Sequence, residues 1–230
     1  MSYFSLVELR RSPEAWRQLR DFSGHGDAYR DHCLIWKLFP GDRHDRDFLF
    51  RRRQQPGDLS YYVVSQRPPE SAQRIFKTQT KVYRPELAVG ERVRFELQAN
   101  PVVSRKYGEA PLGERRRSKR HDVLMDAKWR MRSLVDLPGG IDYAVEEAAL
   151  AWLGKQAGRW GLRIEPQSVL TNAYTQHSLK AKGRPIQFSS LDFCGVAEVT
   201  QPALLSKALL GGVGHARAFG CGLLLVRRVA

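Results

Sequence analysis

The order of the expected strands and helices most constrains the fold, because nearly the same order occurs twice along this 230-residue chain. Residues 92–99 illustrate the strand signal: apolar residues alternate with polar ones, so one face of a strand is apolar. The first half is expected to contain strands 3–9, 47–51, 61–65 and 92–99, a short helix from Pro13 and a helix over 28–39. With a further helix between residues 65 and 92, which no periodic pattern marks, the order becomes β-α-β-β-α-β.

The second half repeats this order after residue 101 if a short strand precedes its first helix. Its other expected elements are a helix from Asp142 to Gly158, strands 168–179 and 186–199, a Thr200-capped helix and a final strand 223–226. A β-α-β-β-α-β unit is the ferredoxin-like pattern. The sequence therefore predicts an α+β protein of two tandem ferredoxin-like (βαββαβ) domains, residues 1–100 and 101–230.

Five glycines fall within twelve positions near the end of the chain: Gly211, Gly212, Gly214, Gly220 and Gly222. Glycine lets the backbone approach a ligand closely and present N–H groups to phosphate, so we expect this segment to bind a polyanion. It lacks the Gly-Lys-Ser/Thr of a P-loop and the last glycine of the dinucleotide fingerprint, so no nucleotide cofactor is expected. The alternative is a flexible turn that leads into an edge strand.

The charge of the chain is strongly unbalanced, with 38 Lys and Arg against 24 Asp and Glu, a formal net charge of +14. Such an excess is the electrostatic signature of nucleic-acid binding. No membrane contact is expected, because there is neither a long basic amphipathic helix nor an apolar run of ~18 residues. The first residues resemble a strand rather than a signal peptide, so we expect a cytoplasmic protein.

The three cysteines are widely spaced and odd in number: Cys33, Cys194 and Cys221. This pattern fits neither a zinc module nor a disulfide framework, and we interpret the three as reduced, small apolar residues. Since no His, Cys, Asp and Glu cluster has metal-ligand spacing, we expect no metal and no cofactor.

The helix expected over 28–39 has two different faces. At ~100° per residue, one face carries Leu34, Ile35 and Leu38 and the other carries Tyr29, His32, Cys33 and Trp36. Lys37 lies at the flank of the second face, and Asp27 is the expected N-cap. A phenol, an imidazole and an ammonium group therefore share one side of the helix.

These three groups match the needs of RNA cleavage without a metal. Such cleavage requires a base for the ribose 2′-hydroxyl, an acid for the leaving 5′-oxygen and a cation for the charge that builds on phosphorus. His32, Tyr29 and Lys37 have these chemistries in that order, and nearby positive charge should lower the pKa of His32. Two alternatives stay open: His25 as the catalytic histidine, and a Tyr/Trp stripe that only packs on a neighbouring domain.

Basic residues also gather outside this helix. Five cations lie between the halves and three at the tip of the hairpin that joins the two long strands, and we expect phosphate contacts from Arg115, Arg116, Arg117, Lys119, Arg120, Lys180, Lys182 and Arg184. A third run, Arg51 to Arg53, ends an expected strand and is given less weight, as an exposed rim.

Three stretches resemble the CasE family, the CRISPR RNA-processing endoribonucleases of the type I-E Cascade complex. They are Tyr29-x-x-His32, the strand and turn 92–101, and the closing segment 211–225. The resemblance implies metal-independent cleavage at the 3′ base of the repeat hairpin, a 2′,3′-cyclic phosphate product and guide RNA that stays bound. It also implies that Tyr29 and His32 are the catalytic pair, whereas Lys37 matches a lysine found in only some members. This chain departs from the family by a longer glycine-rich approach, residues 22–26, with an added His25.

We therefore expect a nuclease of antiviral defence, with the CRISPR repeat hairpin and the other Cascade subunits as partners. The alternatives are a non-catalytic RNA-binding subunit and a DNA-binding regulator, although the sequence has no recognisable helix-turn-helix or dimer zipper. The sequence carries no signal that identifies a foreign inhibitor protein as a partner.

Overall fold

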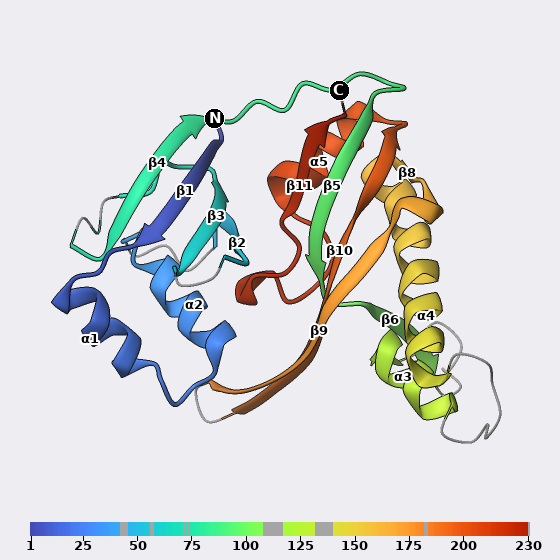
Figure 1. The fold of residues 1–230 in the computed structure, drawn as a ribbon, viewed down its shortest axis with the longest axis horizontal. Helices are drawn as coiled ribbons and strands as arrows, with labels where there is room; N and C mark the ends of the chain where they lie inside the picture. The colour runs from blue at the N-terminus through green and yellow to red at the C-terminus, as the bar shows by residue number, and fades with distance from the viewer. Residues whose placement is uncertain are drawn as a thin grey trace.

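The computed structural model contains two larger antiparallel sheets that lie side by side, with helices packed on each (Figure 1). It describes residues 1–41, 46–55, 58–70, 72, 74–107, 117–131, 140–181 and 184–229. Within these, the side chains of 105–107, 117–120, 130–131, 140–142, 180–181 and 184–185 are not described.

The first sheet has four strands in the order β2-β3-β1-β4, all antiparallel. The elements of this half are β1 (Tyr3–Leu9), α1 (Pro13–Asp21), α2 (Asp27–Trp36), β2 (Phe48–Arg52), β3 (Ser60–Ser65) and β4 (Phe76–Val82). Helix α1 begins after Ser12, whose hydroxyl accepts a hydrogen bond from the backbone N–H of Ala15 at 3.2 Å. Residues in and just after α2 pack with the sheet to form the core of this half.

Strand β4 lies where a helix was expected between residues 65 and 92. Its sequence is polar and only Phe76 is buried, because β4 is an edge strand that pairs with β1 alone. An edge strand with both faces largely in solvent needs no alternating apolar pattern, so the periodicity gave no signal. The described residues that connect β3 to β4 include no helix.

The second sheet has the order β11-β5-β10-β8, with β9 also paired to β10. The elements of this half are β5 (Arg92–Ala99), β6 (Val102–Tyr107), β7 (Arg117–Asp122), α3 (Val123–Met131), α4 (Gly140–Ala157), η1 (Gly158–Trp160), β8 (Leu162–Ile164), η2 (Pro166–Ser168), β9 (Leu170–Ala181), β10 (Arg184–Val199), α5 (Pro202–Gly211), η3 (Arg217–Phe219) and β11 (Leu224–Arg228). Strands β6 and β7 form a separate two-stranded hairpin. Thr200 is not the cap of α5: the N-cap is Gln201, and no side chain caps the helix.

The expected domain boundary at residue 100 is wrong for one strand. Strand β5 lies in the second sheet, between β10 and β11, and Val93, Phe95 and Leu97 are buried in the larger core of that half. It is therefore the strand that was expected to precede the first helix of the second unit. An alternating strand fits either sheet equally well, so its own pattern could not assign it.

Both halves have the strand order of a ferredoxin-like domain. In the first half the order is β4-β1-β3-β2. In the second half β11 pairs with β5, β5 pairs with β10, and β10 pairs on its other edge with both β8 and β9. The prediction of an α+β fold with two tandem ferredoxin-like domains is confirmed.

Strands β9 and β10 continue as a long two-stranded ribbon that reaches toward the first half, below α2 (Figure 1). A Cβ atom on Gly26 would lie 3.0 Å from Leu179 Cδ2, so the ribbon packs directly against the start of α2. The two halves also share a small core of Leu49, Val64 and Leu223. Helix α2, the ribbon and the C-terminal loop therefore meet in one region.

Candidate active site

Helix α2 positions the candidate catalytic residues by burying its opposite face. Leu34, Ile35 and Leu38 are each 0% exposed, which confirms the expected apolar face. Asp27 is not the N-cap: it is the first helical residue, and the N-cap is Gly26, whose φ of +83° few other residues adopt.

The Asp27 carboxylate instead pairs with two arginines. Arg30 Nη1 and Arg52 Nη1 each lie 2.9 Å from one of its oxygens, so the start of α2 is tied to the end of β2. Because a negative group is favoured at a helix N-terminus, Asp27 also suits this position.

Three aromatic contacts run along the other face of α2. The ring centroids of His25 and Tyr29 are 5.3 Å apart, those of Tyr29 and His32 are 6.1 Å apart, and those of His32 and Trp36 are 6.1 Å apart. His25 is exposed, whereas Tyr29 and His32 are half-buried. Tyr29 therefore lies between the two histidines, and the helix brings the expected Tyr/His pair together.

One hydrogen bond determines which nitrogen of His32 is free. Nδ1 lies 2.8 Å from the carbonyl oxygen of Ala218. A carbonyl oxygen only accepts, so Nδ1 carries a proton and donates it, and Nε2 of the neutral ring keeps its lone pair. This is the nitrogen that a general base would use.

The pKa of His32 is lowered, in the expected direction. Burial is the largest cause, the hydrogen bond to Ala218 opposes it, and the charge of Arg46 lowers the pKa further. Positive charge thus contributes as expected, but burial contributes more. The imidazole is neutral at neutral pH.

The pKa of Tyr29 is raised, whereas that of His32 is lowered. The charge of the Cys33 group, a hydrogen bond with that group and burial, in this order, raise the pKa of Tyr29. Its hydroxyl is therefore protonated at neutral pH, which is the form that can donate a proton.

The glycine-rich segment folds into a loop that brings Ala218 to His32. The N–H of Val213 donates to the carbonyl of Gly222 at 2.8 Å, and the N–H of Gly222 donates to the carbonyl of Gln98 at 2.7 Å. The loop is therefore closed on itself and fixed to β5.

Packing explains several of the glycines. A Cβ atom on Gly222 would lie 2.2 Å from the Val213 carbonyl oxygen, and one on Gly212 would lie 2.7 Å from a Leu49 methyl group. Gly220 also has a positive φ and lies against the Phe50 ring, whereas Gly211 ends α5 and Gly214 faces open space. Phosphate binding by this loop stays a prediction.

Lys37 is exposed just after α2. Burial raises the pKa of the Cys33 thiol, and a hydrogen bond with Tyr29 and then the charge of Lys37 oppose this rise. The charge that reaches His32 comes from Arg46, a residue that the sequence analysis missed. Burial and then the charge of Arg217 lower the pKa of Arg46, and its buried Nε has no hydrogen-bond partner in the described part of the chain. No periodic pattern marks a single arginine in a connection, so only the fold could reveal it.

The ribbon adds further rings beside the C-terminal loop. Phe219 lies 5.5 Å from His32 and 5.4 Å from Phe188, and Phe188 stacks on His177 at 4.4 Å between centroids. His177 Nε2 also lies 2.8 Å from Ser190 Oγ. The rings of Phe219, Phe188 and His177 line a cavity of about 790 Å³ between the ribbon, α3 and the loop. A ligand there would lie close to His32.

The expected phosphate-binding cations are only partly placed. Arg117, Lys119 and Arg120 lie on β7, Lys180 lies near the end of β9 and Arg184 begins β10, while Arg115, Arg116 and Lys182 fall outside the described residues. The expected long hairpin, to which Lys180, Lys182 and Arg184 belong, is confirmed by the pairing of β9 with β10. Their contacts with RNA stay predictions.

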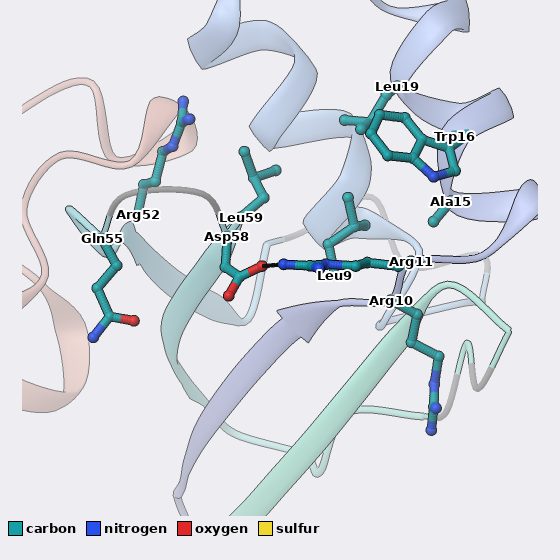
Figure 2. A pocket seen from close by; sticks show the side chains of 10 residues that line it. All are labelled: Leu9, Arg10, Arg11, Ala15, Trp16, Leu19, Arg52, Gln55, Asp58 and Leu59. Carbon is teal, nitrogen blue, oxygen red and sulfur yellow. Dashed lines mark hydrogen bonds and ion pairs between the residues drawn. The ribbon is translucent and has the colours of Figure 1, made fainter.

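Another cavity, of about 320 Å³, lies beside α1 (Figure 2). Figure 2 shows Arg11 pointing at Asp58, with which it forms an ion pair at 3.1 Å, while Trp16 lies over the opposite side. Among the residues that the structure describes, no histidine or tyrosine lines this cavity, so its described lining lacks the groups that the cleavage chemistry requires. We assign the candidate site to His32 instead.

Within the described ranges, no group of three or more His, Cys, Asp and Glu side chains is arranged to hold a metal ion. No described helix is long and apolar enough to cross a membrane.

The chain is similar to known proteins in sequence and in fold. The family model described as CRISPR associated protein matches residues 2–228. The chain belongs to this family. One relative, the CRISPR system Cascade subunit CasE of Escherichia coli strain K12, is 28% identical over 203 residues, which cover 86% of this chain and 90% of the relative. The resemblance to the CasE family is confirmed.

Two solved structures share the fold. Thermus thermophilus Cse3, bound to an RNA representing a pre-cleavage complex, matches with a TM-score of 0.67 and 22% identity over 98% of each chain. The CRISPR endoribonuclease Cse3 bound to a 19-nucleotide RNA matches with a TM-score of 0.65 and 22% identity, over 99% of this chain and 100% of the other.

Proposed function

We propose that this protein is a metal-independent endoribonuclease. It cuts precursor CRISPR RNA at the 3′ base of the repeat hairpin, and it stays bound to the product as a Cascade subunit. The observation that carries the proposal is the hydrogen bond from His32 Nδ1 to Ala218, because it leaves Nε2 free in a half-buried, neutral imidazole. The relatives named CasE and CRISPR endoribonuclease Cse3 support the substrate.

The reaction is an attack by the ribose on its own phosphate. Nε2 of His32 takes the proton of the 2′-hydroxyl, and the 2′-oxygen forms a new bond to phosphorus. The bond from phosphorus to the 5′-oxygen breaks, and that oxygen takes a proton from the Tyr29 hydroxyl. The products are a 2′,3′-cyclic phosphate and a 5′-hydroxyl, and no water is consumed in this step.

Positive charge is needed where the phosphorane forms. Lys37 remains a candidate, but the half-buried Arg46 acts electrostatically on His32 and Arg217 acts on Arg46. Two guanidinium groups that repel each other gain stability when an anion lies between them. We therefore assign the phosphate-stabilising charge to Arg46 and Arg217 alongside Lys37.

The hairpin stem is gripped by phosphate contacts from the ribbon tip, Lys180, Lys182 and Arg184, and from the segment Arg115–Arg120. The ribbon packs against the start of α2, so a stem held there enters beside His32. The proposal assigns binding to these elements and chemistry to α2.

The test compares His32→Ala with His25→Ala in single-turnover cleavage of the repeat hairpin. His32→Ala should lose about 10²–10⁴ in rate while binding the hairpin as the wild type does, because the imidazole moves a proton and does not grip RNA. His25→Ala should cut nearly normally, and Tyr29→Phe should lose less rate than His32→Ala.

If His25→Ala is the inactive variant, the base is misassigned. The main alternative is a non-catalytic RNA-binding subunit, and it would hold if the wild type bound the hairpin without cutting it.

A further inference from the structure

A third cavity, of about 740 Å³, opens between the two sheets. Its walls come from the end of β2 and from β3 and β4 on one side, and from β5 and β11 on the other. His32 does not line it, and neither does the C-terminal glycine loop. We call it the inter-sheet groove.

The groove is strongly basic. Among the described residues that line it, one is a carboxylate, Glu96, and six are cations: Arg51, Arg52, Arg53, Lys81, Arg94 and Arg227. Arg51 pairs with Glu96 at 3.7 Å and with Asp192 at 3.8 Å, and Arg52 pairs with Asp27. The other four have no ion-pair partner among the residues that the structure describes.

Aromatic rings hold two of these four cations. The Arg53 guanidinium lies over the Tyr62 ring at 5.0 Å from its centroid, and the Lys81 ammonium lies over Phe4 at 5.9 Å. Phe4 in turn packs on Tyr62 with centroids 5.5 Å apart. A ring orients a cation without neutralising it, so the charge stays available to an anion.

The free cations lie on both walls. Arg53 follows β2 and Lys81 is on β4, whereas Arg94 is on β5 and Arg227 on β11. An anionic chain that runs between the sheets would therefore meet positive charge on each side. Cations interleaved with aromatic rings are the combination that holds single-stranded nucleic acid, because bases stack on rings and phosphates pair with cations.

We propose that the inter-sheet groove binds a single-stranded segment of the RNA that adjoins the hairpin. The source of the RNA rests on the proposed function, whereas the binding chemistry rests on the groove itself. An acidic protein segment would use the charges but would have no need of the rings, so RNA is the occupant that the groove favours. The run Arg51–Arg53, which the sequence analysis treated as an exposed rim, would then form part of the RNA-binding wall of the groove.

The test measures equilibrium binding of three RNAs with 2′-deoxyribose at the cleavage position, so that none can be cut. They are the hairpin alone, the hairpin with a 5′ single strand and the hairpin with a 3′ single strand. The groove variant is K81Q/R94Q/R227Q, and the control R17Q/K155Q/K207Q removes the same charge from exposed residues on α1, α4 and α5 outside the groove.

The wild type and the control should bind one extended RNA roughly tenfold or more tightly than the hairpin alone. The salt dependence should also be steeper, by about 0.7 per phosphate bound in the groove. The groove variant should lose both gains while it binds the hairpin alone as the wild type does, and it should cut a separate hairpin with a ribose at the cleavage position at the wild-type rate. Thermal melting verifies that the variant is folded.

Equal wild-type affinity for all three RNAs would overturn the proposal, as would a groove variant that keeps the full gain. Loss of binding to an acidic partner subunit, with the RNA gain unchanged, would assign the groove to protein and also overturn it. Failure of the proposed function would appear elsewhere, as a wild type that never cuts a cleavable hairpin.

Discussion

At the residue scale, one backbone carbonyl determines the chemistry of His32. Ala218 lies 186 positions away in sequence, yet its oxygen fixes the proton on Nδ1 and leaves Nε2 free. The base therefore exists only when α2 and the C-terminal loop are folded together. Periodicity along α2 could identify the histidine and its face, but no local pattern could identify the partner that orients it.

The lowered pKa of His32 fixes the sign of the pH dependence. The neutral imidazole is the base, so cleavage should rise with pH, and the midpoint of the rise should lie below the ordinary histidine pKa of 6.5. Since the charge of Arg46 lowers this pKa, Arg46→Gln should move the rising limb to higher pH. Lys37→Gln is the matched control and should leave the limb in place, whatever it does to the maximal rate.

Single-turnover rates between pH 5 and 8 give these profiles directly. An Arg46→Gln profile superimposable on that of the wild type would mean that this charge does not act on the imidazole.

At the element scale, the C-terminal loop and the ribbon have separate tasks. The loop presents Ala218 and Phe219 to His32. Several of its glycines are required by close packing, whether or not the loop also binds phosphate. The ribbon carries cations at its tip and rings at its base. Each element can therefore be disturbed with a different expected effect.

Gly222→Ala tests the loop. The added methyl group would lie 2.2 Å from the Val213 carbonyl oxygen at a φ of +83°, so we expect a loss of roughly 1–3 kcal/mol in the free energy of unfolding together with slower cleavage. Gly214→Ala has a φ of +67° but open space around it, and should lose less of both. Urea denaturation and cleavage rates measure the pair; equal losses would show that the close approach to Val213 does not matter.

Neutral glutamine at Lys180, Lys182 and Arg184 tests the ribbon tip. For each cation–phosphate pair that the substitutions remove, the slope of log K against log salt should become shallower by roughly 0.7 to 0.9. The cut should stay at the same phosphodiester. Lys155→Gln on α4 is the control, and salt titration of hairpin binding is the measurement. An unchanged slope would make the tip a solvated surface, and a shifted cut would make it a reader of bases.

The elements that sequence could predict are those whose pattern is local. Helix α2 has periodic apolar positions, and both this helix and the two ribbon strands are present near the expected bounds. Strand β4 was missed because its edge position requires no apolar face, and β5 was placed in the wrong half because an alternating strand fits either sheet. Arg46 and Ala218 were missed because their roles arise only from contacts between distant segments.

At the scale of the whole molecule, two ferredoxin-like units share one site. The first supplies α2 and the second supplies the loop and the ribbon, so neither half contains the complete arrangement. A net charge of +14 attracts polyanions in general, but charge alone does not cut RNA. The central claim is that side chains and backbone groups perform the cleavage without a metal.

The most direct measurement is cleavage of a pre-folded repeat hairpin by the purified wild type in excess EDTA, with analysis of the product ends. The account predicts an undiminished rate, one cut at the 3′ base of the hairpin and a 2′,3′-cyclic phosphate on the upstream product. A reaction that EDTA abolishes and manganese or zinc restores, or a product without the cyclic phosphate, would contradict it.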